Sequence, residues 1–230
     1  MKPNRPSVRI AVSFRLLAAA AIFAALGACQ SIDTRPVDSP PTASKTGQTQ
    51  TTPPTAAEPS GDRYVRIGYA CCNLRHDGDW IGDSNQARLP FVPVGTPIRI
   101  RKIDGQHAEA EVDGKPMRFA LDSGQQAESI EPWLNKIVVP DDPKARLAKF
   151  PARTRNAIAK GKLHKDMSRE QVIMAVGYPQ TAGNPKLDGT YWRYWWSSFG
   201  PYYVYWTKGG AVSKIRGDAE TVDAVTYSGK

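Results

Sequence analysis

The sequence predicts an α+β fold, in which a small β region is followed by two helices and a three-stranded antiparallel sheet. Two Asp-Gly pairs separate runs of alternating apolar residues, a pattern that is typical of β-hairpins. Ser168 and Gln171 have the spacing of a capping box and predict the start of a helix. Aromatic-rich runs at 190–216 then predict strands. Helices that precede an antiparallel meander are characteristic of the α+β class.

Residues 1–28 of the 230-residue chain have the features of an export signal. The stretch 16–28 is almost wholly apolar and small, and it is shorter than the roughly 20 apolar residues that cross a bilayer. A basic segment precedes it, with Lys2, Arg5, Arg9 and Arg15. We therefore expect this segment to direct export and to be absent from the mature protein.

The signal ends in the run Leu26-Gly27-Ala28-Cys29, which resembles the lipobox of bacterial lipoproteins. The resemblance implies cleavage between Ala28 and Cys29, and attachment of diacylglycerol and a further acyl chain such as palmitate to Cys29. Two or more acyl chains give stable membrane anchoring. Gln30, where an Asp would indicate inner-membrane retention, favours the outer membrane, with the protein on the periplasmic face. The alternative is an ordinary signal peptide that is followed by a chance cysteine.

Residues 29–61 are rich in Pro, Thr, Ser and Gln and contain almost no large apolar side chains. Such a segment cannot bury enough surface to offset the entropy of ordering, so we expect a disordered tether. The folded part is expected to start near Arg63. The formal net charge of the whole chain is +9; without the four basic residues of 1–28 it is +5, and without the tether, whose net charge is −1, it is +6.

This basic charge is not interpreted as nucleic-acid binding, because an exported chain leaves the cytoplasm. Anionic lipid head groups, lipopolysaccharide or an acidic protein surface are the more reasonable partners. A solvated basic surface is an equally good interpretation. Of the three cysteines, Cys71 and Cys72 remain after Cys29 is assigned to lipid. A bond between neighbouring cysteines is uncommon, so we favour burial of one or both as small apolar residues.

Residues 62–125 are predicted to form a small SH3-like β barrel. A first strand at 63–70 is followed by a polar loop and then by three strands that Asp104-Gly105 and Asp113-Gly114 connect as hairpins. Ile103 departs from the period of two, which predicts a bulge near Lys102. Trp80 and Phe91 are expected to cover the open side of the barrel.

A connecting helix is predicted within 126–142, with Ser129 as its N-cap and Pro132 in its first turn. Residues 143–217 are predicted to form the α+β module. Pro151 is expected to break its first helical segment, and Gly161 and Gly177 are expected to close its two helices. Residues 218–230 are assigned to a C-terminal tail.

The α+β module carries a family resemblance over about residues 150–217. Its residues are, in chain order, the run GKLHKDMSREQV at 161–172, the run VGYP at 176–179, Trp192 with Tyr194, Trp206, and Gly210 with Val212 and Ile215. This pattern resembles the SmpA/OmlA (BamE-like) outer-membrane lipoproteins. The resemblance implies a helix–helix–three-stranded antiparallel sheet module and a partner in outer-membrane protein assembly. Asp166 and Val176 replace the family's usual Gly and Leu.

Alternation along 191–196 places the odd-numbered residues on one face of a strand and the even-numbered residues on the other. One face must cover the helices, so the second is expected to be aromatic and partly exposed. Tyr, Trp and Arg are enriched at interface hot spots. The predicted protein-binding residues are Trp192, Arg193, Tyr194, Trp196 and Tyr203. The alternative is that both faces are buried.

No catalytic motif is recognisable, so the chain is predicted to be non-enzymatic, without a cofactor or a metal. His76, Asp77 and Asp79 cluster in a Gly-containing loop and are interpreted as turn chemistry. The predicted function is therefore a periplasmic protein-binding or scaffold lipoprotein. The alternative is a lipoprotein that binds peptidoglycan or another glycan through the SH3-like region, with Arg75, Asp79 and Trp80 as its contacts.

Overall fold

The computed structural model describes residues 63–122, 124, 129–184 and 186–229, which belong to one compact unit. The predicted signal peptide, the lipidation site Cys29 and the tether lie outside the described residues. Within the described ranges, no helix is long and apolar enough to span a bilayer. The unit contains two sheets and several helices, so the predicted α+β class is confirmed.

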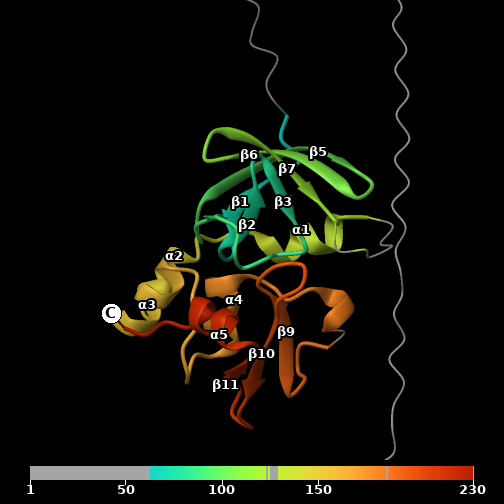
Figure 1. Ribbon diagram of the computed structural model, residues 1–230. Coiled ribbons are helices and arrows are strands. Elements are labelled where there is room, and N and C mark those ends of the chain that lie inside the picture. The colour runs from blue at the N-terminus through green and yellow to red at the C-terminus, as the bar shows by residue number, and fades with distance from the viewer. Residues whose placement is uncertain (1–62, 123, 125–128, 185, 230) are drawn as a thin grey trace, which may run out of the picture. The chain divides into compact units, whose positions relative to one another are not determined.

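The larger sheet is curled and has eight strands in the order β4-β2-β3-β7-β6-β5-β1-β8 (Figure 1). Neighbouring strands are antiparallel except for β3 and β7, which are parallel. The strands are β1 (Arg66–Ala70), β2 (Leu74–Asp77), β3 (Trp80–Gly82), β4 (Phe91–Val92), β5 (Pro97–Asp104), β6 (His107–Val112), β7 (Lys115–Ala120) and β8 (Val138–Val139).

The two predicted Asp-Gly hairpins are confirmed, since β6 pairs with β5 on one side and with β7 on the other. Gly105 and Gly114 have φ values of 57° and 76°, which a residue with a Cβ rarely adopts. The register shifts between Ile100 and Lys102, so the predicted bulge is also confirmed. The polar loop expected after β1 instead contains β2, β3 and β4. These strands are too short to show a local pattern. β2 pairs with its neighbours β3 and β4, and β3 also pairs with the distant strand β7.

The helices are α1 (Glu131–Ile137), α2 (Lys144–Leu147), α3 (Ala152–Ala159), α4 (Arg169–Val176), the 3-10 helix η1 (Thr181–Gly183) and α5 (Ala219–Val225). Pro151 separates α2 from α3 and Gly177 ends α4, as predicted. The capping box is confirmed: Ser168 Oγ accepts from the backbone N–H of Gln171, and the Gln171 side chain accepts from the backbone N–H of Ser168.

Two local predictions are corrected. Ile130, not Ser129, is the N-cap of α1, although Ser129 Oγ still accepts the backbone N–H of Glu131 at 3.2 Å. The segment assigned to a tail contains α5, whose N-cap Asp218 accepts from the backbone N–H of Thr221. Val225 at the end of this helix is buried in the core of the C-terminal half. The tail is thus part of the fold.

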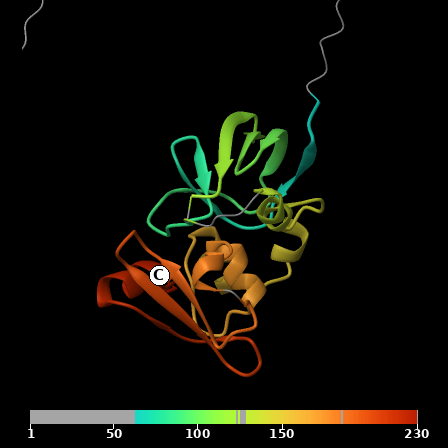
Figure 2. The same cartoon turned by 90° about the vertical axis from the view of Figure 1, so that its right-hand side faces the viewer.

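The smaller sheet is antiparallel with the order β11-β10-β9, where β9 is Tyr191–Trp195, β10 is Pro201–Trp206 and β11 is Val212–Arg216. Its inner face packs on buried side chains of α3 and α4. Figure 2 shows this sheet at the edge of the unit, with α4 on its inner side. The outer face is therefore available for contacts.

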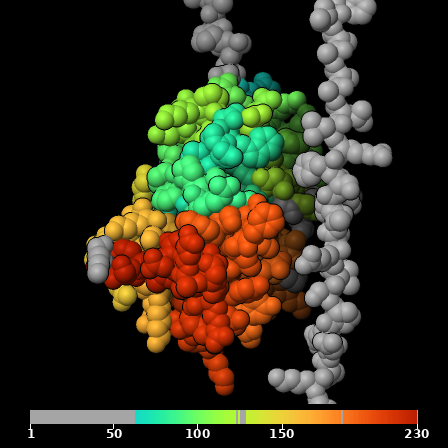
Figure 3. Space-filling model, viewed as in Figure 1, coloured from blue at the N-terminus to red at the C-terminus, as the bar shows by residue number. Residues whose placement is uncertain are grey.

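Two hydrophobic cores fill the unit. The first lies within the curled sheet and against α1, and the second lies between the small sheet and helices α3 and α4. Ile173 of α4 packs against both cores. In Figure 3 the green surface of the first half and the orange surface of the second meet along a continuous boundary.

Cys71 and Cys72 belong to the first core and have exposed fractions of 7% and 0%. Their predicted burial is confirmed. The structure also joins them in a disulfide, so the interpretation of both as simple apolar residues is corrected. The cysteine pair directly precedes Asn73, whose side chain forms hydrogen bonds with the second half of the unit.

The side chain of Asn73, 1% exposed, forms hydrogen bonds with three separate segments. Its amide nitrogen donates to the carbonyl oxygens of Ile158 in α3 at 2.7 Å and Ala175 in α4 at 2.9 Å. Its amide oxygen accepts the backbone N–H of Val94 at 3.0 Å. The Ile158 carbonyl also accepts the backbone N–H of Gly161 at 2.9 Å, whereas the Ala175 carbonyl and the Val94 N–H would be buried polar groups without a partner if Asn73 were absent. Such groups cost more free energy than a single hydrogen bond contributes.

We expect Asn73→Ala to lower the free energy of unfolding by about 3 kcal/mol, because it leaves the buried Ala175 carbonyl and the Val94 N–H without a partner and removes one of the two hydrogen bonds to the Ile158 carbonyl. Chemical denaturation of the full chain measures this loss as a lower midpoint at an unchanged slope. Asn135→Ala, at an exposed site in α1, is the control and should leave the midpoint near that of the parent. Equal midpoints for the two variants would contradict the bridging role of Asn73.

Candidate functional site

The outer face of the small sheet combines aromatic and basic side chains. Residues directly opposite each other in an antiparallel pair point to the same side of the sheet. Tyr203 lies opposite both Arg193 and Arg216, and Tyr205 lies opposite both Tyr191 and Lys214. We call this surface the aromatic–basic face, which consists of Tyr191, Arg193, Trp195, Tyr203, Tyr205, Lys214 and Arg216.

Side chains of the aromatic–basic face contact one another. The ring of Tyr191 lies 5.9 Å from that of Tyr203 and 5.6 Å from that of Tyr205. Lys214 Nζ lies 4.9 Å from the ring centroid of Tyr205. No carboxylate side chain occupies any of the seven positions. The aromatic–basic face therefore presents aromatic rings that already contact one another, together with positive charge that no carboxylate of the face neutralises.

The inner face of the sheet is core. Trp192 and Tyr194 have exposed fractions of 1% and 2%, so the prediction that these two side chains contact a partner is corrected. Trp192 Nε1 donates to the carbonyl of Leu187, and the Tyr194 hydroxyl donates to the carbonyl of Gly177 at 3.1 Å. Burial also raises the pKa of Tyr194 well above its usual value, which keeps the hydroxyl protonated as a donor.

The other three predicted contact residues retain some exposed surface. Arg193 and Tyr203 lie on the aromatic–basic face and are half-buried. Trp196 follows β9 and packs partly against the second core. Sequence alternation therefore separated the two faces of β9, but it did not show which of them covers the helices.

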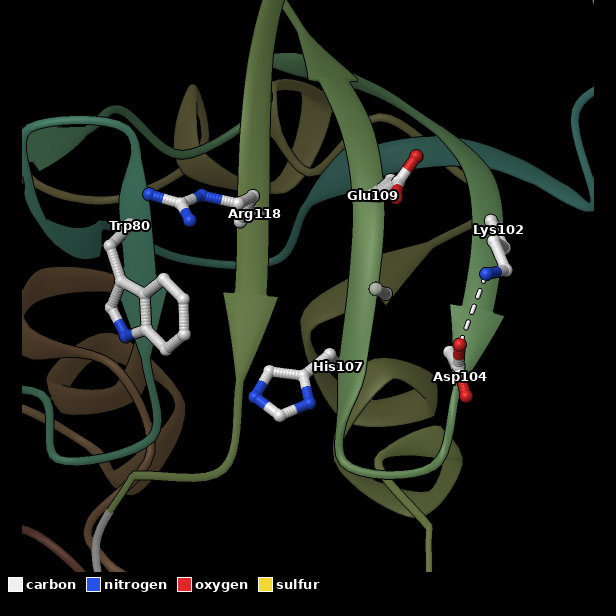
Figure 4. Close-up of a pocket in the computed structure, with 7 residues that line it drawn as sticks. Trp80, Lys102, Asp104, His107, Glu109 and Arg118 are labelled. Carbon is white, nitrogen blue, oxygen red and sulfur yellow. Dashed lines mark hydrogen bonds and ion pairs between the residues drawn. The ribbon is translucent and has the colours of Figure 1, made fainter.

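A second surface lies on the outer face of the curled sheet, where a groove of about 510 Å³ crosses β3, β7, β6 and β5 (Figure 4). We call it the Trp80 groove; its lining residues are Trp80, Lys102, Asp104, His107, Ala108, Glu109 and Arg118. Figure 4 shows Trp80 beside Arg118 at one side, His107 between the strands, and the Lys102–Asp104 pair at the other side.

The Trp80 groove is built from paired groups. Arg118 donates two hydrogen bonds of 2.9 Å to the carboxylate of Asp79, and its guanidinium lies 5.0 Å from the ring centroid of Trp80. The hydrogen bond from Arg118 lowers the pKa of Asp79 below its usual value. His107 meets the Trp80 ring edge-on at 5.9 Å. These contacts hold the indole and the guanidinium in fixed orientations.

Two of the residues predicted for a glycan site, Trp80 and Asp79, are thus at or beside this groove. The third, Arg75, is corrected to a structural role because it is only 7% exposed. Its guanidinium donates to the carbonyls of Leu89 at 2.6 Å and Gly161 at 3.1 Å. It also lies over the ring of Phe91, 4.7 Å from the ring centroid. Burial lowers the pKa of Arg75 from its usual value.

Sequence reasoning missed most of the residues that line the Trp80 groove. Lys102 lies opposite Glu109, and Glu109 lies opposite Arg118, so these three side chains form a row across the hairpins. The positions of the two Asp-Gly turns and the alternation along the strands are the sequence features that indicate this row. The position of Trp80 did not follow, because β3 is a three-residue strand that pairs in parallel with β7.

Among the described residues, no cluster of three or more His, Cys, Asp or Glu side chains is arranged to hold a metal ion. In the loop of His76, Asp77 and Asp79, the ring of His76 hydrogen-bonds the carbonyl of Gly78 and Asp79 pairs with Arg118. Both contacts are local to the turn and its neighbouring strand.

Comparison with models of protein families, with curated proteins and with solved structures finds no match for this chain. The resemblance to the SmpA/OmlA lipoproteins therefore stays a prediction from the residues that carry it.

We expect Arg118→Gln to raise the pKa of Asp79 back toward the usual value of an Asp, because the hydrogen bond that lowers it is lost. Since the folded pKa lies below the unfolded one, the stability that this pair contributes is present above the unfolded pKa. It is lost as the pH falls through the folded pKa. The measurement is a pH titration of the Asp79 carboxyl carbon by NMR. Lys115→Gln, which removes an exposed cation from the same strand, should leave the Asp79 titration unchanged.

Proposed function

We propose that this chain is a non-enzymatic envelope lipoprotein that binds a partner protein through the aromatic–basic face. The observation that carries the proposal is the composition of that face: four aromatic rings and three cations on one outward-facing sheet surface. Such a surface exceeds what folding of the unit requires, because the inner face already supplies the core.

The chemistry of the face favours an acidic protein surface as partner. Tyr, Trp and Arg are the residue types that dominate interface hot spots. Positive charge steers an acidic partner toward the face and discriminates against basic ones.

Anchoring supports the same proposal. A lipid-modified Cys29 at the periplasmic face of the outer membrane would hold the folded unit on a tether, within reach of membrane-associated partners. The unit is proposed to combine an SH3-like region with a BamE-like module. The partner is proposed to belong to outer-membrane protein assembly, which rests on the resemblance of residues 150–217 to the SmpA/OmlA lipoproteins.

We expect Cys29→Ser to abolish lipidation, because the serine hydroxyl does not replace the thiol as acceptor of diacylglycerol. The measurement is metabolic labelling with palmitate together with membrane fractionation. The parent chain should carry label and stay in the outer-membrane fraction, whereas the variant should be unlabelled. Cys71→Ser keeps Cys29 and is the control, and its label should equal that of the parent. Label retained by Cys29→Ser would contradict the assignment.

We expect the double variant Tyr203→Ala, Arg193→Ala to weaken recovery of the partner about tenfold or more, because it removes two central side chains of the face. The measurement is mild crosslinking in living cells, then affinity purification of the lipidated protein and quantitative mass spectrometry. β-Barrel assembly components among the recovered proteins would support the narrower assignment.

The matched control is Tyr64→Ala, Arg101→Ala, which removes a tyrosine and an arginine that contact each other near the first strand. It changes the same residue types at a site away from the face, and recovery should equal that of the parent. If the variant Tyr203→Ala, Arg193→Ala recovers as much partner as the parent does, the aromatic–basic face is not the interface.

A further inference from the structure

The Trp80 groove differs in charge from the aromatic–basic face. Its lining contains Lys102 and Arg118 together with Asp104 and Glu109, and each cation has a close carboxylate partner. The ion pairs cancel most of the local field, so the groove gives no electrostatic preference for a strongly charged ligand. An uncharged polar ligand fits this balance.

The polar groups of the groove are of both hydrogen-bonding kinds. Arg118 and Lys102 donate, Asp104 and Glu109 accept, and the imidazole of His107 can do either. A ligand hydroxyl also donates and accepts at once, so a polyhydroxylated molecule can use every one of these groups. A purely apolar ligand would leave them unpaired, at a cost in free energy.

The half-buried indole of Trp80 supplies the flat apolar wall. Its electron-rich ring attracts groups with partial positive charge, such as the C–H bonds that line one side of a pyranose ring. Arg118 and His107 hold the indole in place from two directions, at 5.0 Å and 5.9 Å. The wall therefore exists before a ligand arrives, which reduces the entropy lost on binding.

The position of the groove disfavours an extended peptide. Peptides commonly add as a strand to a sheet edge, where backbone groups are unpaired. At the Trp80 side of the groove, Trp80, Arg118 and Glu109 each pair with a strand on both sides. A ligand at that side contacts side chains and meets no free strand edge. The groove volume of about 510 Å³ is in the range of small-molecule sites.

We propose that the Trp80 groove binds an uncharged saccharide, with one pyranose ring against Trp80 and its hydroxyls hydrogen-bonded to Arg118, His107 and Glu109. This function is independent of the protein partner on the aromatic–basic face. It would let one lipoprotein hold a protein with one surface and a glycan with the other.

The test is saturation-transfer NMR and calorimetry on the lipidated full chain in a detergent that has no sugar head group. The probes are β-1,4-linked tetramers of N-acetylglucosamine and of glucose, and the stem peptide of the cell wall without sugar. We expect transfer to the ring protons of at least one tetramer. Trp80→Ala should weaken its binding about tenfold or more.

Two controls make the result specific. Phe199→Ala removes an exposed aromatic ring from the turn between β9 and β10, away from the groove, and should bind the tetramer as the parent does. Arg118→Gln keeps a donor but loses the pair with Asp79, and it should bind more weakly than the parent. Absence of transfer to both tetramers, undiminished binding by Trp80→Ala, or binding of the sugar-free peptide alone would each overturn the proposal. A denaturation midpoint of Trp80→Ala near that of the parent separates lost binding from lost folding.

Discussion

The buried amide of Asn73 is the interaction on which the arrangement of the unit depends. One side chain satisfies a carbonyl of α3, a carbonyl of α4 and the N–H of Val94, and so it joins the curled sheet to the helices that carry the small sheet. Arg75, two residues later, makes a similar link through the carbonyl of Gly161. Apolar packing alone tolerates sliding between two cores, whereas directed buried hydrogen bonds specify one relative position.

This connection makes the two faces of the small sheet inequivalent. With α4 held in place, the even-numbered residues of β9 and β10 must face the helices, and Trp192, Tyr194 and Trp206 become core. Arg169 then lies within 5.3 Å and 4.9 Å of the rings of Trp192 and Trp206, which extends the packing to the edge of the core. The odd-numbered residues have no such cover. Their aromatic side chains are not among the buried residues of the second core, and they lie on the same face as three cations.

Local signals in the sequence predicted the local structure well. The Asp-Gly turns, the Lys102 bulge, the capping box and the break at Pro151 all depend on a few neighbouring residues. The signals failed where the outcome depends on distant partners. Strand β3 exists because β7 lies beside it, and Arg75 is buried because Gly161 and Leu89 surround it. An exposed loop arginine and a buried one look alike in sequence, so the candidate glycan site contained one wrong residue.

The two candidate surfaces show how the same residue types acquire different roles through pairing. On the aromatic–basic face, Arg216 and Lys214 lie opposite tyrosines, so their charge is uncompensated and acts over a distance of about 8 to 10 Å in physiological salt. In the Trp80 groove, Arg118 and Lys102 lie beside carboxylates, so only their hydrogen-bonding capacity remains. In the proposed functions, the first arrangement selects a protein partner by charge, and the second selects a saccharide by shape and hydroxyl pattern. The row from Lys102 through Glu109 to Arg118 therefore decides the ligand class as much as Trp80 does.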